Sequence, residues 1–306
     1  MEDQQYINDA IDYVSKELKL HGKTVRTVVE LINDGNTVPF IARYRKEQTG
    51  NLDETQIQAI KESFDYQVQL LNRKEEIIRL IDEQGKLTDE LKKDLLEAKK
   101  LQRLEDLYRP YKQKRRTRAT IAKEKGLEPF AKALWEQQGM DVRGEAEHYL
   151  SEGHELNEVD EVLQGANDIL AEWVSDEPTF REKIRSMTSS KGSLVTEKKK
   201  DAEDDTEIYQ MYYDYHEPVS KVAPHRVLAM NRGEKEKVLK VTIEAPIDAI
   251  LDYLKKEVIK NGQIQEAKIL EAAIEDAYKR LIEPSIERDI RSTLTEAAEE
   301  HAIDIF

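Results

Sequence analysis

Apolar residues recur three and four positions apart along most of the chain, which is the spacing of one face of an α-helix. Residues 6–18 and 25–32 show this pattern, and Asp34-Gly35-Asn36 ends the second segment. We therefore predict two short amphipathic helices within residues 1–52, arranged as a small helix-turn-helix-like head. Such pairs of helices are more often plain packing units than readers of a DNA groove, and both uses stay open.

A much longer helix is predicted to begin after Asp53, because Asp53 and Gln56 have the residue types and spacing of a capping box. The apolar stripe that follows repeats every seven residues, at Ile57, Phe64, Leu71 and Ile78. This repeat predicts one unbroken rod to about residue 84, with Leu71 on its buried side.

A return helix is predicted to follow, capped by Thr88 and stopped by Pro110. The residue before a proline is disfavoured in helical geometry, so Arg109 is expected to leave the helix. Packed against the rod, this helix makes residues 53–125 a long antiparallel helical hairpin that ends in a basic stretch.

The remaining residues predict shorter elements. Residues 126–225 favour a helical domain, in which 189–207 has few large apolar groups and is interpreted as an exposed loop or mobile connection. Residues 226–244 alternate weakly and predict a β-hairpin, and helices interrupted at Pro284 fill the rest of 226–306, leading into a further domain. The predicted fold class is mainly α: an elongated multi-helix scaffold with a long antiparallel helical hairpin and one small β-hairpin.

Four tyrosines gather within seven residues, at Tyr209, Tyr212, Tyr213 and Tyr215. Buried packing with the hydroxyls at the surface is the usual role of such a cluster. Base stacking on nucleic acid is the alternative.

Composition narrows the class of protein. Charged residues make up 36% of the 306 residues, and there is no cysteine, which excludes disulfides, thiolate zinc sites and cysteine nucleophiles and fits a reducing cytoplasm. The first residues are polar and acidic, unlike a signal peptide, and no apolar run is long enough to span a membrane. We therefore expect a cytoplasmic protein without membrane contact.

No catalytic constellation stands out. His21-Gly22-Lys23-Thr24 resembles the end of a phosphate-binding loop, but Glu17 occupies the position that requires glycine. The acidic residues between 201 and 205 lack the spacing of a calcium loop, and a solvated charge run is the simpler interpretation. We expect no enzyme activity, no cofactor and no metal site.

The net charge of −15 is unevenly placed, because residues 99–125 hold 11 basic and 3 acidic residues while 131–306 are net −16. The candidate nucleic-acid contacts in this basic stretch, interleaved with Tyr108 and Tyr111, are Arg109, Lys112, Lys114, Arg115, Arg116 and Arg118. Cations displace condensed counterions from phosphates, and planar groups stack on exposed bases. The alternative is an internal clamp in which these cations pair with the acidic second half.

A second basic segment lies at TVPFIARYRKEQTGN, residues 37–51. Pro39 suits a first helical turn and Gly50 a left-handed cap. On the helical wheel Phe40, Ile41 and Tyr44 share one face, so we predict a wedge with an apolar inside and a basic outside. Arg45 and Lys46 are a possible second nucleic-acid contact, and Arg43 has Glu47 one turn later as an alternative partner.

Together with that segment, three further stretches carry a family resemblance: LEDLYRPYKQKRRTRATIAKEKGLEPFA at 104–131, APHRVLAMNRGEKEKVLKV at 223–241 and LIEPSIERDIRSTLTEAAEEHAI at 281–303. In this order they resemble the Tex family, bacterial transcription accessory proteins distantly related to a eukaryotic elongation factor. The resemblance implies the N-terminal helical part of a longer protein, with RNase H-like, helix-hairpin-helix and OB-fold domains beyond it.

Three functions follow as hypotheses. The resemblance implies a non-catalytic, nucleic-acid-associated scaffold in transcription, binding RNA or DNA weakly and without sequence preference. The alternative is a protein-interaction scaffold for the transcription or translation machinery, such as RNA polymerase or a ribosome-associated partner. An enzyme is the third, and the missing acid–base and metal clusters argue against it.

Overall fold

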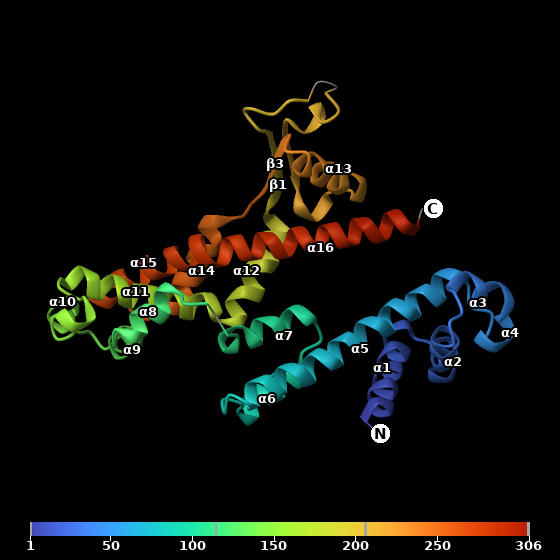
Figure 1. Ribbon diagram of the computed structural model, residues 1–306, viewed down its shortest axis with the longest axis horizontal. Helices are drawn as coiled ribbons and strands as arrows, with labels where there is room; N and C mark the ends of the chain where they lie inside the picture. The colour runs from blue at the N-terminus through green and yellow to red at the C-terminus, as the bar shows by residue number, and fades with distance from the viewer. Residues whose placement is uncertain (1, 114, 205–206, 305–306) are drawn as a thin grey trace. The chain divides into compact units, whose positions relative to one another are not determined.

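The computed structural model describes residues 2–113, 115–204 and 207–304 and divides the chain into two compact units, 1–111 and 112–306. Helices dominate both units, and one small antiparallel sheet lies among the described residues of the second (Figure 1). The predicted mainly-α class is therefore confirmed. The four-part division predicted from the sequence is finer than these two units and stays a prediction.

The first unit is built from seven helices in its described residues; the first three pack against the fifth, and the fourth packs against the second and third. They are α1 (Glu2–Leu18), α2 (Gly22–Asn33), α3 (Val38–Tyr44), α4 (Lys46–Thr49), α5 (Glu54–Asp82), α6 (Asp89–Glu97) and α7 (Leu101–Tyr108), followed by the 3-10 turn η1 (Arg109–Tyr111). Val14, Val28, Ile41 and Ile57 are completely buried in the head core. The two predicted helices of the head are confirmed as α1 and α2.

Helix α5 is the unbroken rod that the capping box predicts. The Asp53 carboxylate accepts from the Gln56 backbone N–H at 2.8 Å, and the Gln56 side-chain oxygen accepts from the Asp53 N–H at 3.1 Å. The seven-residue stripe is wrong at its far end: Leu71 is only partly buried and packs with the head core, while Leu70 faces the second core. At about 100° per residue, Leu70 lies roughly 140° around the helix axis from Ile57, so the second core covers another side of α5 than the head core does.

The return arm of the hairpin is two short helices, not the single helix predicted. Residues 98–100 are extended, with Ala98 at ψ 128° and Lys100 at ψ 138°. Both loose ends are bonded to α5, because the Lys74 ammonium donates to the Leu96 carbonyl and the Leu101 N–H donates to the Tyr66 hydroxyl. The break therefore leaves few backbone groups without a hydrogen bond. It also lets α6 and α7 each turn an apolar side toward α5.

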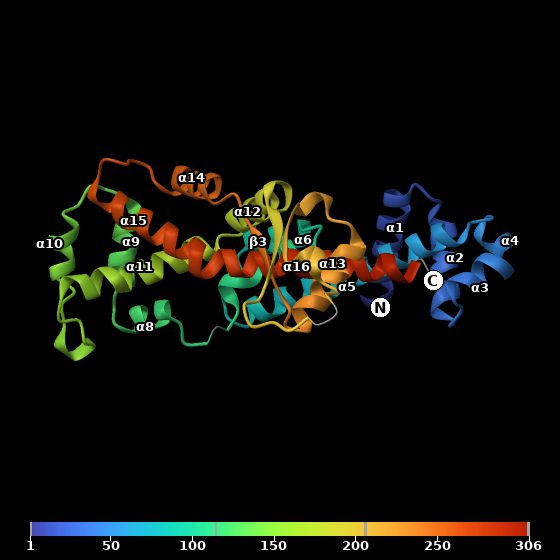
Figure 2. The same ribbon diagram turned by 90° about the horizontal axis from the view of Figure 1, so that it is seen from above.

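The second unit is centred on α11, which packs against α8, α9 and α15 (Figures 1 and 2). Its helices are α8 (Arg118–Glu124), α9 (Glu128–Glu136), α10 (Val142–Glu147), α11 (Val159–Asp176), α12 (Pro178–Lys191), α13 (Pro224–Lys235), α14 (Ile247–Val258), α15 (Gln265–Asp276) and α16 (Glu283–Asp304). The predicted interruption at Pro284 takes the form of a π-helical segment, Ala277–Ile282, between α15 and α16. The completely buried residues Val162, Ile169 and Leu170 place α11 inside the core.

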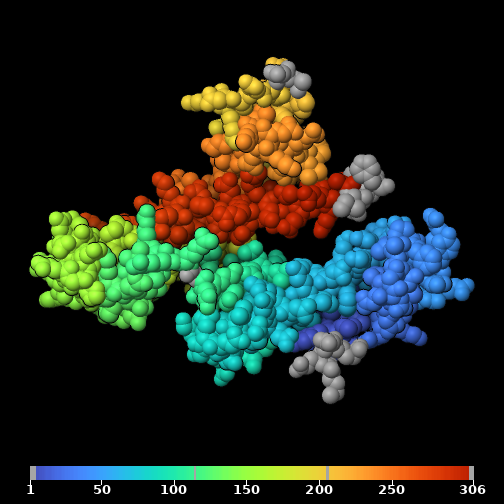
Figure 3. All heavy atoms as spheres, viewed as in Figure 1, coloured from blue at the N-terminus to red at the C-terminus, as the bar shows by residue number. Residues whose placement is uncertain are grey.

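The β-hairpin predicted at 226–244 is wrong in position. Residues 226–230 belong to α13, and only β3 (Leu239–Glu244) is a strand there. Its partner is β1 (Ser193–Lys198), which lies inside the segment predicted to be an exposed loop, and β2 (Asp214–Pro218) pairs with the other edge of β1. Helix α13 packs on α16. Together with α13 the strands project from one side of α16, as the yellow and orange atoms in Figure 3 show.

A narrow apolar face explains why β1 escapes detection. Leu194 and Thr196 are buried opposite Ile243 and Val241, whereas the outward Val195 is only partly buried and the strand ends on the exposed, charged Glu197 and Lys198. The Thr196 hydroxyl donates to the Tyr212 carbonyl at 2.6 Å, so even the threonine is satisfied inside. Two inward residues are too short a signal for the period of a strand.

The tyrosine cluster is packed against this sheet, which confirms the interpretation as buried packing. Tyr209 and Tyr212 are buried, and Tyr213 and Tyr215 are half-buried. The Tyr209, Tyr213 and Tyr215 hydroxyls donate to the carboxylates of Glu236, Asp204 and Glu217 respectively. Desolvation on burial, reinforced by the bond to Asp204, raises the pKa of Tyr213 to about 12.

Leu70→Ala is expected to lower the free energy of unfolding by about 2–5 kcal/mol, because it empties part of the core between α5 and the return helices. The neighbouring Leu71→Ala is the matched control and should cost only about 1 kcal/mol, because that side chain is partly exposed. Chemical denaturation measures both. Equal losses at the two positions would contradict the assignment of the buried face.

Alkaline pH should destabilise the tyrosine cluster. Unfolding releases Tyr213 to its ordinary pKa of 10, so the unfolded chain loses the proton first and stability falls between pH 10 and about 12. In Tyr213→Phe this part of the loss should be absent, as seen in denaturation curves taken across that range. Identical pH profiles for the two proteins would show that the hydroxyl is not protected.

Candidate nucleic-acid interface

Within the basic stretch, the candidate nucleic-acid contacts begin at Arg109, where α7 gives way to η1. Pro110 ends α7 as predicted, but Arg109 keeps helical angles, φ −49° and ψ −45°, so the expectation that it leaves the helix is wrong. The chain tightens into a 3-10 turn, which tolerates a proline that the α-helix does not. Arg109 is half-buried, and the Tyr111 carbonyl that closes the turn accepts from the Gln84 side chain at 2.9 Å.

The next cations are on the surface of the second unit. Lys112, Arg115, Arg116 and Arg118 are exposed, whereas Lys114 lies outside the described residues. Thr117 caps α8 by accepting from the Thr120 N–H at 3.0 Å, so Arg118 is the first residue of that helix. The exposed cations of the stretch therefore lie on a short connection that ends at the capped N-terminus of α8.

Ion pairs divide the basic stretch into two parts. Arg116 pairs with Glu124 of the adjoining helix at 2.8 Å, and both side chains are more than half exposed. Lys123 reaches Glu172 on α11 at 3.2 Å, where the carboxylate is largely buried. Lys123 thus makes the kind of contact that the clamp requires, whereas Arg116 pairs with an exposed carboxylate on the adjoining helix.

The tyrosines of the stretch contribute little free ring surface. Tyr108 packs in the second core of the first unit, and the Arg73 guanidinium lies 5.6 Å from its ring centroid. Tyr111 is partly buried against the same core. The basic stretch consequently supplies charge more than stacking.

The head places its second cluster, which we call the head patch, on α3 and α4: Phe40, Arg43, Tyr44, Arg45 and Lys46. Pro39 lies in the first turn of α3, and Gly50 caps α4 at φ 71°, both as predicted. A break at Arg45 separates the two short helices, and the completely buried Thr49 donates its hydroxyl to the Arg45 and Lys46 carbonyls at 3.3 Å.

The predicted apolar inside of this wedge is only partly right. Ile41 is completely buried, but Phe40 is 37% exposed and Tyr44 61% exposed. Val38, Ile41 and Ala42 face the head core, which turns the neighbouring Phe40–Tyr44 side outward. Helical spacing alone groups all of these residues, and nothing in the sequence marks which half of the stripe is covered.

The cations of the head patch are not matched by local carboxylates. Within the described part of the chain, no ion pair joins Arg43 to Glu47, and none reaches Arg45 or Lys46. The Arg45 guanidinium instead lies 5.4 Å from the Phe40 ring centroid. The alternative partner proposed for Arg43 is therefore not adopted here.

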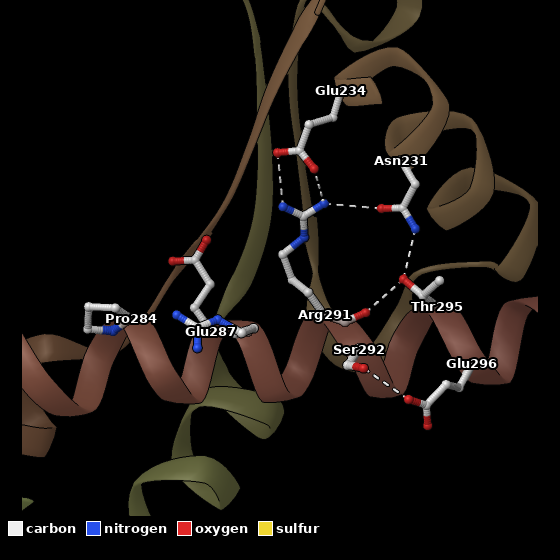
Figure 4. Close-up of a pocket in the computed structure, with 9 residues that line it drawn as sticks. Asn231, Glu234, Pro284, Glu287, Arg291, Ser292, Thr295 and Glu296 are labelled. Carbon is white, nitrogen blue, oxygen red and sulfur yellow. Dashed lines mark hydrogen bonds and ion pairs between the residues drawn. The ribbon is translucent and has the colours of Figure 1, made fainter. Parts of the chain in front are cut away.

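A groove that no sequence prediction pointed to runs between α13 and α16, with a volume of about 650 Å³ (Figure 4). Arg291 braces it: the guanidinium makes two bonds to the Glu234 carboxylate, at 3.0 and 2.6 Å, and others to Asn231 and the Val241 carbonyl. Because its donors are committed to protein acceptors, Arg291 ties α13 and β3 to α16. Nearby, burial raises the pKa of the Glu287 carboxyl.

Across the described residues, no three His, Asp or Glu side chains come together in a way that could hold a metal ion. None of the helices described combines the length and apolar character needed to cross a membrane.

Two family models match the chain. A family model for the Tex central region-like domain matches residues 137–306, and one for the Tex-like protein N-terminal domain matches residues 8–82. The chain belongs to the Tex family. The resemblance carried by the four sequence stretches is confirmed. Arg45 and Lys46 lie inside the N-terminal match, whereas the cations at 109–118 lie between the two matched regions of this Tex-family chain.

Relatives match nearly the whole chain. YdcI of Bacillus subtilis (strain 168) is 55% identical over 96% of this chain and 41% of its own length, and the transcriptional accessory protein Tex of Neisseria gonorrhoeae is 35% identical over 96% and 39%. The human S1 RNA-binding domain-containing protein 1 is 27% identical over 97% and 31%. The Tex-family chain thus spans about two fifths or less of these relatives.

Two double-mutant cycles distinguish the parts of the basic stretch. The coupling between Arg116 and Glu124 is expected to be below about 1 kcal/mol in unfolding free energy, because both partners are in water. The coupling between Lys123 and Glu172 should be larger, because Glu172 is largely buried. If the Arg116 pair proved the stronger, burial of Glu172 would not be what decides the strength of these ion pairs.

Proposed function

We propose that this chain is the N-terminal helical scaffold of a transcription accessory protein, and that it contacts nucleic acid without catalysing a reaction. The contact is weak and independent of sequence, and it lies mainly on the basic stretch from Arg109 to Arg118, with Arg45 and Lys46 as a second contact. The family supports the scaffold and the transcription role. The bacterial relatives favour a cytoplasmic location.

The exposure of Arg115, Arg116 and Arg118 is the observation on which the nucleic-acid contact depends. A chain of net charge −15 repels a polyanion at long range. Attraction requires a patch whose local field reverses that sign, and residues 99–125 carry a net charge of +8. Salt screens charges more than about 10 Å away, so the exposed cations nearest a bound phosphate act on it more strongly than the net charge of the whole chain does.

RNA is the nucleic acid that the relatives favour, since the name of the human relative includes RNA binding. The structure adds a chemical reason for tolerance of sequence. Exposed guanidinium groups bind phosphates, which every sequence shares. Neither a recognition helix nor a fixed hydrogen-bonding edge is needed for this contact.

Binding should weaken with salt in proportion to the phosphates contacted. For roughly three contacts, the slope of log affinity against log salt is expected to be about −2 to −3, at about 0.7–0.9 per phosphate. The triple change Lys114→Glu, Arg115→Glu, Arg116→Glu should abolish binding and leave the melting curve nearly unchanged. Fluorescence anisotropy with labelled single- and double-stranded oligonucleotides at several salt concentrations measures the first, and chemical denaturation the second.

The matched control reverses three exposed lysines of the first unit, Lys86, Lys92 and Lys93, and so alters net charge equally. It should keep most of the affinity if the contact is local. If the control lost as much affinity as the test variant, the loss would be due to repulsion between the nucleic acid and the net negative charge of the chain, not to a local contact. If the test variant unfolds and the parent shows no salt-sensitive binding, the clamp is correct and the contact at 109–118 is withdrawn.

A protein-interaction scaffold is the second candidate, and one observation favours it. Ile208 and Met211, beside the small sheet, are each 68% exposed. Apolar side chains this exposed are typical of surfaces that meet another protein. The partner would belong to the transcription or translation machinery, such as RNA polymerase or the ribosome. Ile208→Ser, Met211→Ser should then weaken capture of that machinery and leave oligonucleotide binding intact.

A further inference from the structure

The head patch carries two exposed aromatic rings that the phosphate contacts proposed above do not use. Phe40 and Tyr44 lie one turn apart on α3, with ring centroids 5.1 Å apart and planes tilted by 45°. Single exposed aromatic residues are common and need no explanation. Two exposed aromatic rings in contact with each other, beside the cations Arg43, Arg45 and Lys46, are a less common arrangement.

The rings are held in place from below. Ile41 anchors α3 in the head core, and the Arg45 N–H donates to the Ile41 carbonyl at 2.9 Å. The backbone then turns at Arg45, which brings its guanidinium over the Phe40 ring, and the buried Thr49 fixes the next turn. The Phe40 ring is therefore in contact with a cation on one side and with the tilted Tyr44 ring beside it, while Tyr44 keeps most of its surface in water.

We propose that the head patch is a stacking platform for single-stranded nucleic acid, with Tyr44 as the ring on which a base stacks and Phe40 as its support. The proposal rests on the proposed function for the class of ligand and adds a second, base-dependent contact. An exposed ring offers a flat apolar face to any base, and the cations beside it neutralise the adjoining phosphates.

Charge and shape favour this occupant over an acidic peptide. Among the described residues, Arg43, Arg45 and Lys46 have no carboxylate partner in the head, and Glu47 is the one acidic residue in 37–51. A peptide rich in carboxylates would use these cations but has no planar group for Tyr44. Duplex DNA would also use the cations, but its bases are already stacked on one another. Only an unpaired strand uses both the cations and the ring.

The deciding experiment compares two probes with the intact 306-residue chain. One is an RNA of roughly 12 nucleotides, and the other has the same backbone without bases. Base stacking predicts that the base-bearing strand binds about fivefold or more tightly than the abasic one. Tyr44→Ala should bring this ratio close to one, and Tyr44→Phe should restore it. The salt slope should stay unchanged in both variants, because no phosphate contact is removed.

Tyr13→Ala is the matched control, since Tyr13 is another exposed tyrosine of the same unit at 37% exposure. It should leave the ratio as in the parent chain. Arg45→Gln should lower the magnitude of the salt slope by about 0.7, the value for one contact on a single strand. Denaturation of each variant checks that the head stays folded.

The outcomes separate this platform from the basic stretch. A parent ratio near one, or a ratio that Tyr44→Ala leaves unchanged, overturns the platform and leaves the contact at 109–118 standing. A ratio that depends on Tyr44 while Arg115→Glu, Arg116→Glu has no effect supports the platform and overturns the basic-stretch contact. A polyglutamate peptide that displaces the RNA and loses affinity equally in Tyr44→Ala would assign the patch to acidic peptides. Absence of binding to either strand overturns both.

Discussion

Burial of a narrow apolar stripe on each helix is the constraint on which both units depend. With 36% of its residues charged, the chain must gather its apolar side chains onto single faces, and each face then needs a neighbour. Helix α5 meets this need by serving two cores, with Ile57 and Ile60 in the head and Ile77 and Ile81 against α6 and α7. In the second unit α11 is covered on several sides, and its small residues permit close approach: a Cβ at Gly165 would lie 2.3 Å from Leu127.

Long elements with marked ends are what the sequence predicts well. The rod from Asp53, the caps at Thr88 and Gly50, and the stop at Pro110 each follow from local chemistry that tertiary packing does not override. Short elements are predicted poorly, because the contacts that decide their structure come from residues elsewhere in the chain. Strand β1 exists because Leu194 and Thr196 find β3 forty-odd residues later, and residues 226–230 become helical although their apolar run also suits a strand.

The candidate site shows the same division. The charge of the basic stretch can be counted in the sequence, but the partner of each cation cannot. Arg116 finds Glu124 across a helix start, and Lys123 finds Glu172 from another helix, so neighbouring cations have different surroundings. The exposed ring of Tyr44 was missed for a related reason: a helical wheel shows which side chains share a face, not which faces are covered.

The π-helical segment Ala277–Ile282 changes the direction in which side chains point along the continuous helix formed by α15 and α16. A π turn advances the chain by more residues than an α turn, so the angular phase of side chains after it differs from the phase before it. Helix α15 can therefore face α11 with Leu270 and Ile274, while α16 faces α12 and α13 with a differently oriented row. The π-helical segment thus lets one continuous helix turn apolar side chains toward α11 before it and toward α12 and α13 after it, without any break in the chain's helical course.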